Sequence, residues 1–230
     1  MLNLCKCGAG IACAAGLAAG LVSVGFMAGR TAPAPAGSAI AVAQPEGMDP
    51  EAMMKLWEEK NRTGAQHEFL AKSAGTWDAE VKMWMDPSAP PDISQGSEKN
   101  SMIFDGRYLK GEFTGDWMGE KFEGISFVAY NNTEERFESI WIDSTGTALM
   151  FSTGEKQGND TLVFTGEMKD CMSEQMMSYR NVLKFESPDK RVMTMHHTMA
   201  GMPEMKVMEI TYTRRGAGRG VSNDGNRANN

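Results

Sequence analysis

Short segments in which apolar and polar residues alternate fill the sequence from Thr76 to Arg215. In TWDAEVKMWM (76–85), Trp77, Ala79 and Val81 fall on one face, and charged residues stand between them on the other. A period of two residues is typical of a β-strand with one buried face. Turn-forming residues separate this segment from similar ones that follow, so the pattern predicts strands joined by hairpins.

About ten such segments follow one another without a helix-length pattern between them. The predicted turns include Asp105-Gly106, Asn131-Asn132-Thr133, Ser144-Thr145-Gly146, Ser187-Pro188-Asp189 and Ala200-Gly201. A long antiparallel meander usually closes on itself, because closure removes its unpaired edges. A sandwich is the alternative, but it would need longer crossover loops. We therefore predict an all-β, antiparallel up-and-down barrel over residues 76–215, wide enough to hold a small ligand.

Residues 48–75 precede the barrel and predict two short helices. Asp49 suits the N-cap of the first, Pro50 suits its first position, and the helix should end near Asn61. The second is HEFLAKSAG, ending at Gly75. A Pro/Ala linker occupies residues 31–47, and the tail 216–230 is expected to be disordered because it has almost no apolar residue to dock.

The N-terminal segment, residues 1–30, contains an uncharged run between Lys6 and Arg30 that predicts a hydrophobic helix. Two interpretations stay open: a signal peptide cleaved after Ala43, or an uncleaved membrane anchor. Both interpretations place the predicted barrel outside the cytoplasmic membrane, in the cell envelope or periplasm, where the protein is either membrane-anchored or secreted. In both, the membrane is a partner through this N-terminal segment.

Cys171 is the one cysteine beyond the segment, so the barrel is expected to fold without an internal disulfide. The net charge of −7 argues against nucleic acid as a partner.

The tripeptide Gly75-Thr76-Trp77 resembles the G-x-W signature of lipocalins and related calycin barrels. That resemblance implies that Trp77 closes the base of the barrel and that a basic residue of the last strand, Arg214 or Arg215, stacks over it. A longer series is similar to a bacterial exported family, a domain of unknown function with a lipocalin-like barrel, over about residues 65–215: HEFLAKSAGTWDAEVKMW, EKNSMIFDGRYLKGEF, MGEKFEGISFVAYNN, SIWID and MEITYTRR. This similarity implies a lipocalin-like barrel and an exported protein. It implies no activity and no catalytic residue.

The segment VMTMHHTMAGMPEMKVM (192–208) combines methionines with two histidines. Met193, Met195, His197 and Met199 share one face of a strand, and thioethers beside an imidazole suit Cu(I). A barrel wall that needs apolar side chains explains the same spacing, since methionine fills irregular space well. We favour the lining interpretation; copper held by His197, Met195 and Met199, or haem held by His197, stays as the alternative.

Arg180 has two interpretations. Its face of the strand is the more polar one, which favours exposure to solvent. If Arg180 faces inward instead, its charge would require a carboxylate from a ligand, Glu112 or Glu209.

No hydrolase, transferase or nucleotide-binding motif is present, so no catalytic residue is assigned. An enzyme that uses an interior Arg/Glu/Tyr set is a third hypothesis. The predicted function is binding of a small apolar or amphipathic molecule, with these candidate lining residues: Trp141, Arg180, Met193, Met195, His197, Met208 and Tyr212.

Overall fold

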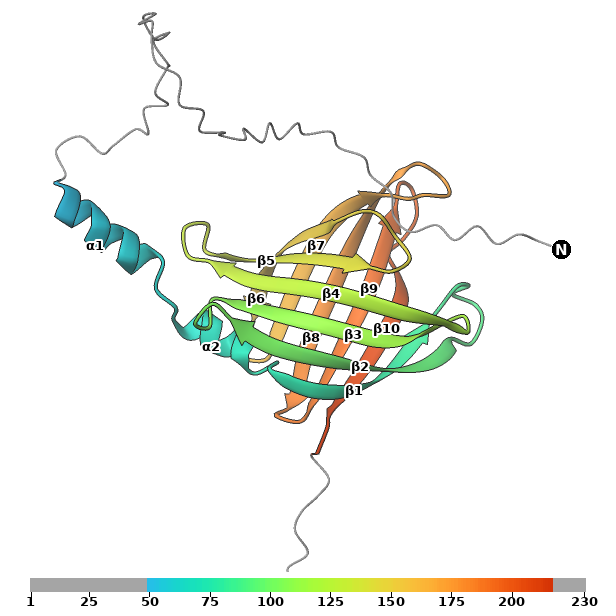
Figure 1. The fold of residues 1–230 in the computed structure, drawn as a ribbon. Helices are drawn as coiled ribbons and strands as arrows, with labels where there is room; N and C mark the ends of the chain where they lie inside the picture. The colour runs from blue at the N-terminus through green and yellow to red at the C-terminus, as the bar shows by residue number, and fades with distance from the viewer. Residues whose placement is uncertain (1–48, 217–230) are drawn as a thin grey trace, which may run out of the picture. The chain divides into compact units, whose positions relative to one another are not determined.

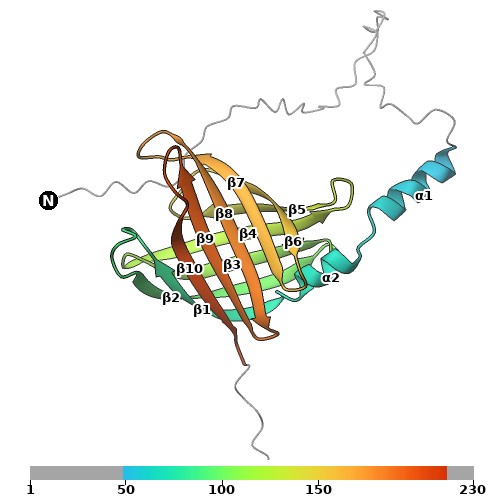
Figure 2. The same cartoon turned by 180° about the vertical axis from the view of Figure 1, so that it is seen from behind.

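The computed structural model describes residues 49–216, and ten antiparallel strands in them close into a barrel (Figures 1 and 2). Each strand pairs with its neighbours in the chain, and β1 pairs with β10 to complete the ring. The strands are β1 (Gly75–Met83), β2 (Asp92–Ile103), β3 (Tyr108–Trp117), β4 (Glu120–Asn131), β5 (Arg136–Asp143), β6 (Met150–Gln157), β7 (Thr161–Lys169), β8 (Met176–Ser187), β9 (Lys190–Met199) and β10 (Met205–Arg214). The predicted barrel of about ten strands is confirmed.

The ends of two strands are set by their partners. β2 begins at Asp92, because Asp92 and Ser94 continue the ladder with Met83 and Val81. β6 extends to Gln157, because its last residues pair with the start of β7. Side-chain alternation identifies a strand, whereas its ends depend on the partner strand.

Two helices precede the strands. In α1 (Pro50–Lys60), the Asp49 side chain accepts a hydrogen bond from the Ala52 amide at 2.8 Å, so the predicted N-cap is confirmed. α1 belongs to a compact unit separate from the barrel, and α2 (Ala65–Ala71) belongs to the same unit as the barrel. α2 ends earlier than predicted, and Gly75 instead begins β1 with a φ of +121°, a conformation that favours glycine.

α2 packs at one end of the barrel, against β3 and β4 (Figure 1). Its buried Phe69 and Leu70 join barrel side chains in one apolar cluster, which also contains Leu109, Phe137, Leu162 and Phe164. A second cluster surrounds the fully buried Trp77 and contains Ala79, Val81, Phe113, Ile210 and Tyr212. The tightly packed part of the interior is therefore concentrated around the end that carries α2.

The predicted N-terminal hydrophobic helix and the linker lie outside the described residues, as does nearly all of the predicted disordered tail. Among residues 49–216, no helix is long and apolar enough to cross a membrane.

Candidate ligand-binding interior

Strand pairing assigns each side chain to the inner or the outer face of the barrel. On β1, the buried residues Trp77, Ala79 and Val81 alternate with charged residues that face solvent. Cross-strand partners point to the same side of a sheet, so the pairings extend this assignment around the ring. The strand ends next to α2 form what we call the floor, and the opposite strand ends form the mouth.

Trp77 closes the floor. Its indole Nε1 donates a hydrogen bond to the Ser73 carbonyl at 2.8 Å, and the Arg214 guanidinium lies 4.1 Å from the ring centroid. Arg214 also donates to the carbonyls of Ala74 and Lys72. A Cβ at Gly75 would lie 2.6 Å from Arg214 Nη1, so only glycine leaves room for this stack. The structure thus brings Gly75, Trp77 and Arg214 together, while Arg215 points away and pairs with Asp78 on the outside.

A buried ion pair lies above Trp77, formed by Arg191 of β9 and Glu98 of β2. The Arg191 guanidinium stacks 4.5 Å from the Trp77 ring and 4.4 Å from the Tyr212 ring. Trp77 is therefore covered by two arginines, Arg191 and Arg214. Burial raises the pKa of Tyr212 well above its usual value, and the Glu98 carboxylate raises it further, so the phenol stays neutral.

The sequence prediction missed Arg191 and Glu98. A signal was present, because Arg191 has the same strand parity as Met193, Met195 and His197. A charged residue at the start of a strand normally faces solvent, and the partner that compensates it lies 93 positions away.

The walls carry glycines covered by aromatic rings from neighbouring strands. A Cβ at Gly124 would overlap the Trp141 ring, one at Gly154 would meet Phe164, and one at Gly166 would meet Tyr179. Each ring lies over the backbone beside it, a packing that glycine alone permits. These rings therefore cover the wall rather than projecting across the barrel.

Trp141 faces inward near the mouth. Its indole Nε1 donates to Asp143 Oδ2 at 2.8 Å, and its ring stacks on Phe122 with an interplanar angle of 21°. Both rings are half-buried. Trp141 is thus a fixed aromatic surface on the inner wall.

The methionines of β9 and β10 cover the opposite wall. Met193, Met195, His197 and Met199 alternate on the inner face of β9, and Met208 of β10 lies directly opposite Met195. All of them are half-buried, in contrast to the fully buried Trp77 and Phe137. An inward side chain that solvent still reaches must border accessible space, so the barrel is less completely packed toward its mouth than at its floor.

His197 is the one titratable side chain on this methionine face. Burial lowers its pKa below the usual value, and the nearby Asp170 carboxylate opposes that shift. The neutral imidazole is therefore the favoured form near pH 7. The surface that His197 shares with its methionine neighbours is uncharged.

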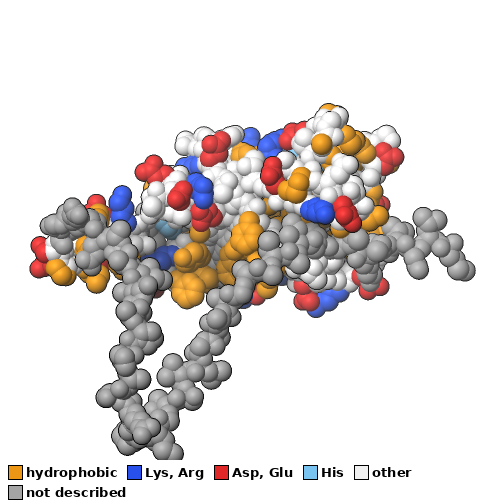
Figure 3. Space-filling view, turned by 90° about the horizontal axis from the view of Figure 1, so that it is seen from above, with side chains coloured by type: hydrophobic (Ala, Val, Ile, Leu, Met, Phe, Trp, Pro, Cys, Tyr) orange, Lys and Arg blue, Asp and Glu red, His pale blue; other side chains and the backbone are white. Residues whose placement is uncertain are grey.

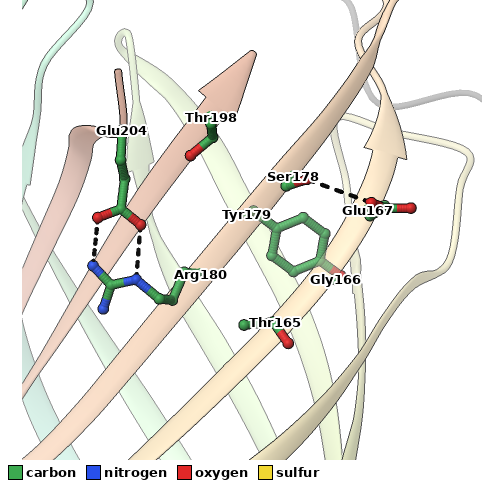
Figure 4. A pocket seen from close by; sticks show the side chains of 8 residues that line it. All are labelled: Thr165, Gly166, Glu167, Ser178, Tyr179, Arg180, Thr198 and Glu204. Carbon is green, nitrogen blue, oxygen red and sulfur yellow. Dashed lines mark hydrogen bonds and ion pairs between the residues drawn. The ribbon is translucent and has the colours of Figure 1, made fainter. Parts of the chain in front are cut away.

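Arg180 does not line the interior, so its inclusion among the lining residues was wrong. It pairs across the sheet with Thr165 and His196 on the outer face, opposite in parity to the buried Tyr179. Its guanidinium makes two hydrogen bonds of 2.7 Å to Glu204, as Figure 4 shows. A carboxylate does compensate this arginine, but it comes from the β9–β10 connection and not from Glu112, Glu209 or a ligand.

The hollow beside this ion pair has a volume of about 470 Å³ and extends along β7 and β8. Half of its lining residues are exposed, namely Thr165, Glu167, Ser178 and Glu204 (Figure 4). It is a surface depression with few apolar side chains, unlike the inner wall near the mouth.

Among the described residues, the structure adds no cluster of carboxylate, thiolate or imidazole ligands to the metal site predicted at His197. No group of three or more His, Cys, Asp or Glu side chains that could hold a metal occurs within residues 49–216. The set of His197, Met195 and Met199 would rely on thioethers and one imidazole. Copper or haem at His197 stays a prediction.

Solved structures with a similar fold share little sequence with the chain. The S-type phycobiliprotein lyase CPES from Guillardia theta is 15% identical, with a TM-score of 0.45, over 68% of this chain and 96% of that one. Rv2717c from M. tuberculosis is 10% identical, with a TM-score of 0.46, over 67% and 99% of the two chains. A redesigned β-barrel, b11L5F_LGL, is 14% identical, with a TM-score of 0.35, over 64% and 94%. These likenesses concern the barrel alone and carry no argument about function.

No curated protein matches the chain. A family model does match residues 62–214, which include α2 and all ten strands. That range also contains the floor, the buried ion pair and the methionine face. The chain belongs to the family described as "Protein of unknown function (DUF1579)".

Proposed function

We propose that the barrel binds a small, uncharged apolar or amphipathic molecule between its floor and its mouth. One observation carries this proposal: Trp141, Met193, Met195, His197 and Met208 face inward yet stay half-buried. Protein cores are close-packed, and accessible apolar surface inside a fold is unfavourable unless something covers it. A bound apolar molecule would cover it.

The charges of the interior support an uncharged ligand. Glu98 already compensates Arg191, and burial favours the neutral form of His197. A free carboxylate would therefore meet no uncompensated cation among these residues and would lose its hydration on entry. Methionine adapts its shape readily, which suits a ligand with a flexible apolar part.

Fluorescence of Nile red, a neutral apolar dye, tests the proposal. Ser139 faces inward on β5 between Val128 and Ser152, so Ser139→Trp places a large side chain in the interior. Thr153 is exposed on the outer face of β6, so Thr153→Trp adds the same side chain outside the barrel. We expect saturable dye binding to the wild type and to Thr153→Trp, and at least about a tenfold weaker affinity for Ser139→Trp.

Equal dye binding by both variants, with circular dichroism showing that both are folded, would contradict binding inside the barrel. No saturable binding by the wild type to Nile red or to a short alkyl alcohol would contradict it as well.

A second candidate function is Cu(I) binding near the mouth. Met205 of β10 lies directly opposite His197, and Met199 lies opposite Met177 of β8, so more thioethers surround the imidazole than one strand supplies. Soft thioethers select Cu(I). Titration against a chromogenic Cu(I) chelator should show one site lost in both His197→Ala and Met205→Leu; an unchanged copper affinity in both would exclude it.

We further propose that the protein acts outside the cytoplasmic membrane, supported by the uncharged run between Lys6 and Arg30. Fractionation of the native host should recover it in the envelope or the medium. Recovery with the cytoplasmic fraction would contradict this proposal and leave the ligand proposal untouched.

A further inference from the structure

Exposed apolar side chains ring the mouth of the barrel. Five connections lie at this end, and each carries one large apolar residue that is about half exposed or more. These residues are Met85 (69%), Met118 (71%), Leu149 (54%), Met172 (73%) and Met202 (49%), which we call the apolar rim.

The other end of the barrel differs. Four connections lie there, and within the described residues only the β2–β3 connection carries a large exposed apolar side chain, Phe104. The remaining three are built from polar residues, glycine and proline, such as NTEE at 132–135. The apolar rim is thus specific to one end, although methionine is common throughout the sequence.

Local hydrogen bonds shape the connections that carry the rim. The carboxylates of Asp86, Asp116 and Asp170 accept from the backbone amides of Ser88, Gly119 and Ser173 at 2.7–2.9 Å. Met118 and Gly119 both have positive φ, as a two-residue hairpin turn of type I′ requires. These bonds give the connections a defined shape while the apolar side chains stay exposed.

We propose that the apolar rim docks the mouth of the barrel onto the surface of a lipid membrane. Protein interfaces usually have a contiguous, close-packed apolar centre surrounded by polar residues. Here the large exposed apolar side chains are methionine and leucine, and they are distributed one by one over five separate connections. Side chains separated in this way can each enter a fluid layer independently, and lipid insertion needs no matching surface.

The rim is also continuous with the inner methionine face. Met202 follows the end of β9, where Met199 and His197 face inward, and Met205 begins β10 opposite His197. An apolar molecule leaving a bilayer at the mouth would therefore meet apolar surface from the rim to the inner wall. The proposal goes beyond ligand binding, because a barrel can bind a ligand taken from water without docking to lipid.

The charge of the protein selects the kind of lipid. Asp86, Asp116 and Asp170 stand beside rim residues, and the whole chain has a net charge of −7. Figure 3 shows acidic and basic side chains interspersed with hydrophobic ones on one face of the molecule. Attraction to anionic headgroups needs clustered Lys or Arg, so docking should favour neutral, zwitterionic lipid.

A fluorescent label on the rim tests this docking in the full chain. Cys171 is exposed and stands next to Met172, so an environment-sensitive NBD maleimide reports on one rim connection. The other cysteines, at positions 5, 7 and 13, are replaced by serine. With phosphatidylcholine vesicles, we expect a blue shift and a several-fold rise in emission. In the control, Cys171 is also replaced by serine and the label is placed at Asn159→Cys, in the β6–β7 turn at the other end; this label should not respond.

The matched variant replaces three rim residues outside the labelled connection: Met85→Ser, Met118→Ser and Met202→Ser. These side chains are exposed, so circular dichroism should be unchanged. The lipid concentration giving half of the emission change should rise at least about tenfold, because each buried methionine favours the lipid phase. Every variant keeps residues 1–48, so any membrane contact of that segment is the same in all of them.

Three results would overturn the proposal. The first is no emission change at Cys171, even if the protein floats with the vesicles. The second is an equal change at both label positions, and the third is an unchanged lipid concentration in the triple variant. A requirement for anionic lipid would overturn the assignment to neutral lipid. Nile red uptake without any rim response would leave the ligand proposal standing.

Discussion

Replacing Arg191 with methionine (Arg191→Met) removes the cation of the buried ion pair and leaves Glu98 without its partner. Arg191 is 3% exposed and Glu98 is 9% exposed, so water cannot replace the lost interaction easily. Methionine occupies much of the volume of the arginine stem, which limits the cavity that forms. The main effect is therefore electrostatic.

The expected loss follows from the geometry. Breaking one partner of a buried ion pair costs about 3–5 kcal/mol, because an uncompensated charge stays in the interior. Part of this loss is the stacking of the guanidinium on Trp77 and Tyr212, a contact of the kind worth roughly 0.5–2 kcal/mol. For a chain of this length, about 3–5 kcal/mol corresponds to a fall in Tm of roughly 6–20 °C.

Urea unfolding followed by circular dichroism measures this loss, in a double-mutant cycle. Glu98→Met combined with Arg191→Met should cost at least about 1.5 kcal/mol less than the sum of the single variants, because no buried charge is left over. Arg136→Met is the matched control, since Arg136 pairs with Glu138 at the surface. The control should change stability by less than about 0.5 kcal/mol.

An Arg191→Met variant within about 1 kcal/mol of the wild type would refute the reasoning. So would additive effects of the two single variants, since they would show that Arg191 and Glu98 do not stabilise the fold as a pair.

Three further predictions concern other parts of the interior. Burial lowers the pKa of His197, so the unfolded state takes up its proton first as pH falls below about 6.5. The wild type should therefore lose unfolding free energy between pH 7 and 5, and His197→Phe should lose less; parallel pH curves would contradict this. Gly124→Val should displace the Trp141 ring, seen as a shift in tryptophan emission and a loss of about 1–3 kcal/mol, whereas unchanged emission and stability would show that the ring does not depend on Gly124. Arg214→Leu should cost about 2–4 kcal/mol, since it removes the hydrogen bonds to the carbonyls of Ala74 and Lys72 and the stack on the fully buried Trp77; a loss below about 1 kcal/mol would argue against closure by Arg214.

The barrel could be predicted from the sequence because its signals are local. Alternation in segments such as TWDAEVKMWM identifies strands, and turns such as Asp105-Gly106 identify their connections. Parity within β9 also placed Met193, Met195 and His197 on a common face, and the structure shows that this face points inward. The resemblance to a family of unknown function is confirmed by the match over residues 62–214.

The charged residues of the interior could not be predicted in the same way. Parity divides a strand into two faces, but it does not say on which face an arginine will find a carboxylate that compensates its charge. Arg180 and Arg191 both begin or interrupt apolar runs, yet one pairs with Glu204 outside and the other with Glu98 inside. That choice depends on partners from distant strands, which meet only when the barrel closes.

Native mass spectrometry of the protein purified from its own host tests ligand binding most directly. We expect a non-covalent adduct of an uncharged, lipid-like mass that organic solvent releases. The adduct should be present on the wild type and on Thr153→Trp and absent from Ser139→Trp. A bare polypeptide mass for the wild type, or an adduct that Ser139→Trp retains at full occupancy, would contradict a ligand held inside the barrel.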